Sequence, residues 1–219
     1  MNKAFFPLLF WIIFSPCFPA TPFAAEDPPT KPAVSGDAVI VLEDFSVPDE
    51  RGLPKGWIAQ KENPDPTQVY QIKKENDRFY LAASGRSNRL FKKMQWNPHQ
   101  YPFLSWKWRM KHVPTDVQKE RRAAVYVSLD RDLLGIPKIT KYLWSSLAPT
   151  GEEVSGGFFG ASTVVIRSGS TQAGEWVTET INVLEDFKRL HGEGPGEAAY
   201  GIGIMTGIEA DFAEFIAHR

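Results

Sequence analysis

Tyr101–Lys111 reads YPFLSWKWRMK, and this stretch indicates the fold more clearly than any other part of the chain. Apolar side chains occupy every second position, at Leu104, Trp106, Trp108 and Met110. Polar side chains occupy the positions between and after them, at Ser105, Lys107, Arg109 and Lys111. A period of two residues is typical of a β-strand with one buried and one polar face. The two tryptophans on the apolar face predict a strand in the middle of a sheet, packed against a second layer.

Short alternating runs continue on both sides of this strand and are separated by turn residues. We expect strands at residues 39–45, 68–74, 77–83, 88–94, 101–111, 123–130, 138–146, 161–168, 175–183, 200–206 and 211–217. The last of these is compatible with a short helix as well, and Leu184–His191 is the one clear helical segment. Many short strands at intervals of about ten residues predict an all-β, single-domain β-sandwich, jelly-roll-like, with one short helix.

The first 25 residues differ in composition from the rest of the chain. Lys3 is the only charged residue before Glu26, and Phe5–Phe14 is an apolar run. A membrane-spanning helix needs about 20 apolar residues, so this shorter run predicts a signal peptide at residues 1–25. An uncleaved anchor and a lipoprotein modified at Cys17 are the alternatives. We therefore expect an exported protein, periplasmic or extracellular, with no transmembrane span in the mature chain.

The sequence after the predicted signal peptide divides into two parts. Residues 26–37 are polar and rich in proline, which predicts a linker. Residues 38–219 are long enough to bury a proper core and are predicted to form the sandwich domain.

Charge and cysteine content exclude several classes of function. The 25 basic residues are balanced by 26 acidic ones, so there is no basic excess for binding nucleic acid. The single cysteine, Cys17, lies in the predicted signal peptide, which leaves no thiolate nucleophile or disulfide in the mature chain. The histidines lack the close spacing of zinc ligands. We expect no cofactor, and a structural Ca²⁺ between Glu43 or Asp44 and Glu209 or Asp211 is the alternative for a metal.

Motifs in the second half of the chain occur in a characteristic order. They include SWKWRM at 105–110, AAVYVSL at 123–129, YLWSS at 142–146, VIRSG at 165–169 and GIGIMT at 201–206. In this order the chain resembles DUF3047, a family of exported bacterial proteins of unassigned function, from about residue 39 to the C-terminus. The resemblance implies a jelly-roll-like sandwich similar to galactose-binding-type domains, and it implies no activity. The family pattern often has arginine where Ala124 and Ile181 stand, so a polar site of the relatives would be altered here.

Aromatic and basic residues on strand faces and in loops provide the candidate binding site. Trp96 and Trp144 are the tryptophans expected to be partly exposed, and sugars bind flat against such rings. Cations are contributed by Lys107, Arg109 and Arg167, where Arg167 is expected to share a face with Val165. Tyr126 and Asp130 share another face. If these faces coincide, they form a cationic, aromatic-edged surface suited to an anionic sugar or a carboxylate. The alternative is a solvated face, or ion pairs with Glu179 or Asp130.

Three functions follow from these features, in order of preference. The first is a non-catalytic binding module whose partner is a carbohydrate or another polar ligand of the cell envelope. The second is a glycan-acting enzyme, for which Glu175 and Glu179 are the only acids expected on one strand face. The third is an assembly partner of an envelope protein complex, which would bind a protein through an exposed sheet edge.

Overall fold

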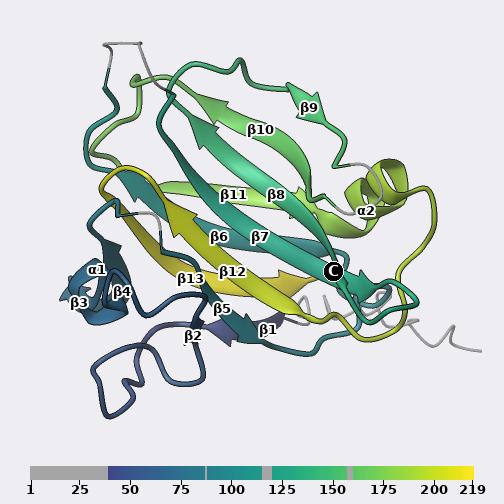
Figure 1. The fold of residues 1–219 in the computed structure, drawn as a ribbon, viewed down its shortest axis with the longest axis horizontal. Helices are drawn as coiled ribbons and strands as arrows, with labels where there is room; N and C mark the ends of the chain where they lie inside the picture. The colour runs from purple at the N-terminus through teal and green to yellow at the C-terminus, as the bar shows by residue number, and fades with distance from the viewer. Residues whose placement is uncertain (1–38, 87, 115–119, 157–159) are drawn as a thin grey trace, which may run out of the picture. The chain divides into compact units, whose positions relative to one another are not determined.

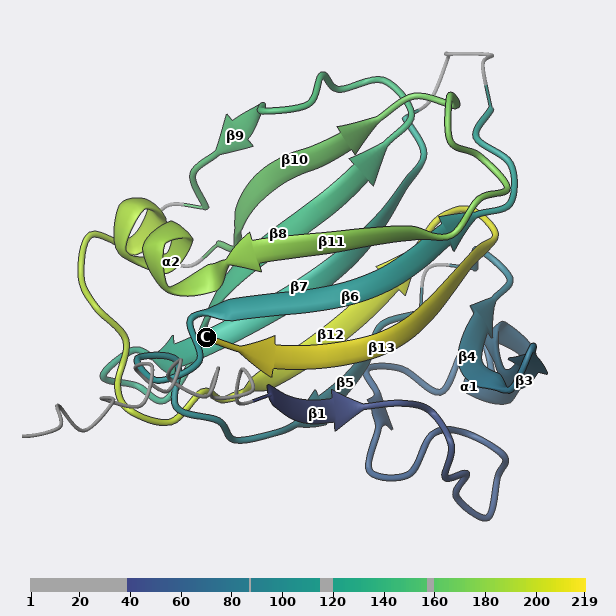
Figure 2. The ribbon, with the colours of Figure 1, turned by 180° about the vertical axis from the view of Figure 1, so that it is seen from behind.

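Two β-sheets packed face to face make up the described part of the chain (Figures 1 and 2). The computed structural model describes residues 39–86, 88–114, 120–156 and 160–219, which belong to the unit Gly36–Arg219. The predicted signal peptide and linker lie outside the described residues. Within these residues the prediction of a jelly-roll-like β-sandwich is confirmed.

The first sheet has six strands in the order β11-β6-β13-β4-β3, with β1 also paired to β13. Its strands are β1 (Val39–Glu43), β3 (Tyr70–Glu75), β4 (Arg78–Ala83), β6 (Phe103–Met110), β11 (Val177–Asn182) and β13 (Ala210–His218). The strand β6 lies between β11 and β13, so its predicted place inside a sheet is confirmed. The C-terminal segment is a strand rather than a helix, because it pairs with β6, β4 and β1.

The second sheet has seven strands in the order β2-β5-β12-β7-β8-β10-β9. Its strands are β2 (Ile58–Ala59), β5 (Leu90–Lys93), β7 (Arg122–Arg131), β8 (Pro137–Ser145), β9 (Glu153–Val154), β10 (Ser162–Ser168) and β12 (Gly201–Thr206). The strands β8 and β10 run parallel, and the chain returns between them through β9. Figure 1 looks onto this sheet, and Figure 2 looks onto the six-stranded one.

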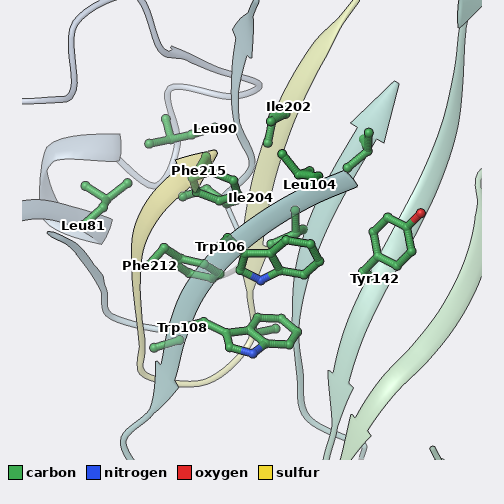
Figure 3. Close-up of a cluster of buried hydrophobic side chains, with 14 of the residues drawn as sticks. Leu81, Leu90, Leu104, Trp106, Trp108, Tyr142, Ile202, Ile204, Phe212 and Phe215 are labelled. Atoms are coloured by element: carbon green, nitrogen blue, oxygen red, sulfur yellow. The ribbon is translucent and has the colours of Figure 1, made fainter. Parts of the chain in front are cut away.

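Aromatic side chains fill the space between the sheets (Figure 3). Trp106 and Trp108 of β6 are fully buried and meet edge to face, with ring centroids 5.7 Å apart. Across the interface, Tyr142 of β8 lies 5.8 Å from Trp106, and Trp144 of the same strand lies 5.6 Å from Trp108. Each large aromatic ring buries on the order of 150–250 Å². These contacts explain why the alternation in β6 is the strongest signal in the sequence.

The expectation that Trp96 and Trp144 are partly exposed is wrong. Trp144 is 1% exposed because it lies on the inward face of β8, where its Nε1 donates a hydrogen bond to the carbonyl oxygen of Gly169 at 3.0 Å. Trp96 is 4% exposed and belongs to the same buried cluster, although it lies in the loop after β5. Neither ring presents a face to solvent on which a sugar could lie.

Two helices complete the described part of the chain. The predicted helix is confirmed as α2 (Val183–His191), which begins where the side chain of Asn182 accepts a hydrogen bond from the backbone N–H of Glu185. It ends at Gly192, whose φ of +77° is favourable only for glycine. The short α1 (Pro66–Val69) was not predicted. Neither described helix is long and apolar enough to cross a membrane.

Candidate ligand-binding site

The predicted site residues do not come together on one surface. Lys107 and Arg109 lie on the outer face of the six-stranded sheet, whereas Tyr126 lies on the outer face of the seven-stranded sheet. The expectation that these faces coincide is therefore wrong, because the two sheets turn their outer faces in opposite directions. Asp130 lies near the end of β7, where its carboxylate accepts hydrogen bonds from the backbone N–H groups of Arg131 and Gly196 at 2.7 and 3.2 Å.

Carboxylates neutralise the cations on the outer face of the six-stranded sheet. Lys107 Nζ lies 2.5 Å from Glu214, and Arg109 Nη2 lies 2.7 Å from Asp211. Arg109 also pairs with Glu75 at 3.1 Å, and the ring of Trp176 covers its guanidinium at 4.5 Å. These ion pairs are the alternative that the sequence left open, although their acidic partners differ from the ones considered there. Both cations are paired with carboxylates, so this face offers little net positive charge to an anionic ligand.

Arg167 points into the sandwich instead of sharing a face with Val165. A β-bulge between the two residues places Arg167 opposite the inward-facing Trp144. Its Nε donates a hydrogen bond to Oε1 of Glu179 at 2.7 Å, and the same oxygen accepts one from Nε1 of Trp108 at 2.9 Å. The ion pair connects β10 of one sheet with β11 of the other, so it contributes to holding the sheets together.

The acids considered for catalysis do not share a strand face. The strand β11 begins at Val177, so Glu175 lies before it and is exposed, whereas Glu179 is 8% exposed and paired with Arg167. The carboxyl groups of Asp44, Asp65, Glu75 and Glu214 have a shifted pKa, and in each case the pKa is lowered. A general acid needs a raised pKa, so none of these four groups is suited to that role.

The carboxylates considered for Ca²⁺ are engaged by protein groups. Glu43 accepts hydrogen bonds from Lys92 Nζ at 2.6 Å and from Trp57 Nε1 at 2.8 Å, and Asp211 is paired with Arg109. Over the parts of the chain that the structure describes, no three His, Cys, Asp or Glu side chains come close enough to hold a metal ion.

A pocket of about 270 Å³ opens on the outer face of the seven-stranded sheet. Its apolar part is formed by Ala124, Leu143 and Met205, which belong to a small hydrophobic cluster on that face. Its polar part is formed by Arg121, Arg122, Tyr126, Lys141 and Glu120. Basic side chains therefore outnumber acidic ones around an apolar floor.

Tyr126 is one of the residues that line this pocket, and two cations lie against its ring. Lys141 is its partner on the neighbouring strand β8, and Lys141 Nζ lies 5.6 Å from the ring centroid. The guanidinium carbon of Arg89 lies 5.2 Å from the same centroid. Among the described residues, no carboxylate lies within ion-pair distance of Arg89 or Lys141. We call these three residues the Tyr126 centre.

The aromatic contact holds these cations in place without cancelling their charge. A cation over an aromatic ring is attracted to the electrons of the ring, yet its N–H donors stay available to an anion. On the six-stranded sheet, by contrast, Arg78 and Arg109 contact aromatic rings and are also paired with carboxylates. The Tyr126 centre therefore differs from the opposite face in having cations that are positioned but not neutralised.

The cations near Tyr126 are close enough to repel one another. Burial lowers the pKa of Lys141, and the positive charges of Arg122 and Arg89 lower it further. Arg122 has a partner, Glu120, at 3.6 Å, but that carboxylate also accepts a hydrogen bond from Ser145 Oγ at 2.6 Å. A bound anion would offset the mutual repulsion of Lys141, Arg89 and Arg122.

Of the three residues at this centre, Tyr126 was among the residues considered from the sequence, whereas Lys141 and Arg89 were not predicted. The pairing of Tyr126 with Lys141 follows from the β7–β8 hairpin, yet an irregularity between Ser128 and Asp130 shifts its register. Arg89 reaches the ring from beyond β12, across a strand more than 100 residues later in the chain. The hairpin register was the one signal in the sequence that could have indicated Lys141.

Comparison with known proteins gives a family and several distant structural similarities. The family model described as "Protein of unknown function (DUF3047)" matches residues 55–214. No curated protein sequence matches the chain.

Among solved structures, the chain is similar to a carbohydrate-binding module of family 29, with 9% identity, 83% of this chain and 92% of that chain covered, and a TM-score of 0.40. A family 12 xyloglucanase from Bacillus licheniformis has 8% identity, 83% and 100% coverage and a TM-score of 0.40. A carbohydrate-binding module described by its mannan recognition has 12% identity, 83% and 97% coverage and a TM-score of 0.36. Similarities this low carry no argument about function.

Proposed function

Because the chain belongs to the DUF3047 family, which is described as of unknown function, we propose a function from the site itself: this protein is a non-catalytic binding protein for an anionic carbohydrate. One observation carries the proposal. At the Tyr126 centre, Arg89 and Lys141 are held against an aromatic ring without a described carboxylate partner, beside a pocket of about 270 Å³.

The chemistry of the pocket favours a sugar that carries a carboxylate or sulfate group. Arginine presents a planar fork of donors that matches such groups, and lysine adds a compact charge. The apolar floor around Leu143 and Met205 suits the carbon-bound hydrogens of a sugar ring. A neutral sugar would leave the repulsion between Lys141, Arg122 and Arg89 uncompensated.

The test compares an acidic oligosaccharide with its neutral counterpart. We expect a short oligogalacturonate to bind the protein in titration calorimetry, and its methyl ester to bind at least about tenfold more weakly. A hydrogen bond to a charged group contributes roughly 1.5–3 kcal/mol, and ~1.4 kcal/mol corresponds to a factor of ten. Sulfated and phosphorylated oligosaccharides complete the set of ligands, and binding should weaken as salt is raised.

A pair of variants locates the binding to this face. Arg89→Gln should weaken binding of the acidic ligand by about tenfold, because it removes one unpaired cation. Lys73→Gln is the matched control, since Lys73 is exposed on the six-stranded sheet and forms no described ion pair. Equal binding of acid and ester, or equal effects of the two variants, would contradict the proposal.

If no anionic sugar binds, the remaining candidate is a protein contact through Leu133 and Leu134, which are 105% and 78% exposed at the tip of the β7–β8 hairpin.

We also propose that the protein acts outside the inner membrane, as the apolar N-terminal segment indicates. Expressed with its own N-terminus in a Gram-negative host, the protein should be found in the periplasm or the medium. Sequencing of its mature N-terminus should begin at Glu26. A cytoplasmic protein that retains Met1 would contradict this proposal, and lipid on Cys17 would identify the lipoprotein alternative.

A further inference from the structure

The arrangement at the Tyr126 centre occurs a second time on the same sheet. Tyr200, which directly precedes β12, has Lys93 Nζ at 5.6 Å and the guanidinium carbon of Arg131 at 5.1 Å from its ring centroid. Both cations are exposed, and neither has a carboxylate at ion-pair distance among the residues that the structure describes. We call Tyr200, Lys93 and Arg131 the Tyr200 centre.

Phe91 lies between the two centres. Its ring stacks on Tyr200 with centroids 5.6 Å apart and an interplanar angle of 27°. In the sheet register, Phe91 of β5 faces Gly203 of β12, and Gly203 faces Tyr126 of β7 on its other side. A Cβ atom on Gly201 would lie 2.7 Å from Cζ of Phe91, so glycine at this position makes room for the ring over β12.

The spacing of the two centres is fixed by the strand that joins them. Tyr200 and Gly203 are three residues apart along the chain, and an extended strand rises by roughly 3.3 Å per residue, which gives about 10 Å. The backbone N–H of Tyr200 donates a hydrogen bond to the carbonyl of Ser128, two residues from Tyr126. Both centres therefore stand on one hydrogen-bonded sheet, with a separation comparable to two successive linkages of a sugar chain, from its first ring to its third.

From this repetition we propose that the ligand is an extended polyanionic polysaccharide, bound within its chain across the Tyr126 and Tyr200 centres together. The inference rests on the proposed function and specifies its ligand. Two charged groups of one chain would bind at the two pairs of unneutralised cations, and the sugar between them would lie over the exposed part of Phe91. A single charged sugar could occupy only one of the two centres.

Single-stranded nucleic acid is also a flexible polyanion, but this face suits it less well. Sequence-independent binding of single strands relies on open aromatic rings for base stacking. Tyr126 is only 6% exposed, and Arg89 and Lys141 lie against its ring. The chain as a whole carries a formal charge of −1, so it lacks the overall basic excess that is typical of proteins that bind nucleic acid.

The experiment measures affinity as a function of ligand length. Galacturonate oligomers of two, four and six units, and heparin-derived oligomers as a sulfated series, are titrated into the full chain as produced by an exporting host. We expect affinity to rise by at least about tenfold between the dimer and an oligomer that reaches both centres, because the second contact becomes intramolecular. The Lys93→Gln/Arg131→Gln double variant should abolish this gain, whereas the dimer should still bind at the Tyr126 centre.

The control variant Lys55→Gln/Lys73→Gln removes two positive charges from exposed lysines that form no described ion pair. It should retain the gain with length. Dimer binding without any such gain, or an equal loss in both double variants, would overturn the two-centre inference and leave the Tyr126 centre intact. Failure of dimer and longer oligomers alike would overturn the proposed function as well. Tighter binding of a thymidine hexanucleotide than of every oligosaccharide would overturn the inference in favour of nucleic acid.

Discussion

Arg109→Ala is expected to lower the free energy of unfolding by about 3–5 kcal/mol, although Arg109 lies on an outer face of the sandwich. Its partner Asp211 is completely buried, and one carboxylate oxygen of Asp211 accepts hydrogen bonds from Nε and Nη2 of Arg109 at 2.9 and 2.7 Å. The other oxygen has no hydrogen-bond partner among the described residues, and Lys111 Nζ lies 3.6 Å from it. Removing the guanidinium would leave the buried negative charge with Lys111 as its one remaining cation among the described residues, and without hydrogen bonds from Arg109.

Chemical denaturation of three variants separates the buried charge from the loss of an ordinary surface pair. Lys107→Ala removes one of the two cationic partners of Glu214, which keeps 29% of its side chain exposed, and this should cost no more than about 1 kcal/mol. Adding Asp211→Asn to Arg109→Ala should restore part of the lost stability, because the buried group is then neutral. If Arg109→Ala costs no more than Lys107→Ala, the account of Asp211 as a buried charge that depends on Arg109 is wrong.

The fold could be predicted largely from local patterns, because the core is built on strict alternation. In β6 every second side chain, from Leu104 to Met110, is fully buried, as the sequence indicated. Departures from this alternation could not be predicted from the sequence. The bulge in β10 turns Arg167 inward, and the exposed position of Glu175 follows from where β11 begins. Such irregularities depend on pairing between strands, which a single strand's sequence does not encode.

The proposed binding surface could not be predicted in the same way, because a cation's partner comes from distant parts of the chain. Lys107, Arg109 and Lys141 all occupy alternating positions in strands and look equivalent in the sequence. The carboxylates that neutralise the first two come from β13 and β3, through Glu214, Asp211 and Glu75. Lys141 lies opposite Tyr126 instead and receives no described carboxylate. Tertiary pairing therefore decides which cations remain available.

Cations without a carboxylate partner lower the stability of the folded protein, because neighbouring unpaired positive charges repel one another. Sites arranged for a ligand commonly lower the stability of the free protein for this reason. The six-stranded sheet shows the opposite arrangement, in which Glu214 pairs with both Arg78 and Lys107. We therefore predict that replacing Lys107 by a neutral residue lowers the stability of the protein, whereas replacing Lys141 by a neutral residue raises it.

Lys141→Met is expected to abolish most of the binding of an anionic ligand while making the free protein more stable. Methionine keeps the apolar stem that packs in the pocket and removes the charge. The pKa of Lys141 is lowered in the folded protein by burial, Arg122 and Arg89, so carrying this charge lowers the stability of the folded protein. The gain in Tm should not exceed about 2–4 °C, the shift that ~1 kcal/mol produces in a domain of this size, because partial solvent contact screens the repulsion.

The pH dependence of Tm is a second test of whether the charge of Lys141 destabilises the folded protein. A lysine whose pKa is lower in the folded than in the unfolded state binds its proton more weakly when folded, so its contribution to stability improves as pH rises above the folded-state pKa. The difference in Tm between wild type and Lys141→Met should therefore shrink as pH is raised towards the unfolded pKa of 10.5. Lys73→Met should leave binding, Tm and the pH profile unchanged. A lower Tm for Lys141→Met at neutral pH, or full ligand affinity in that variant, would show that Lys141 is a structural lysine and not part of an anion site.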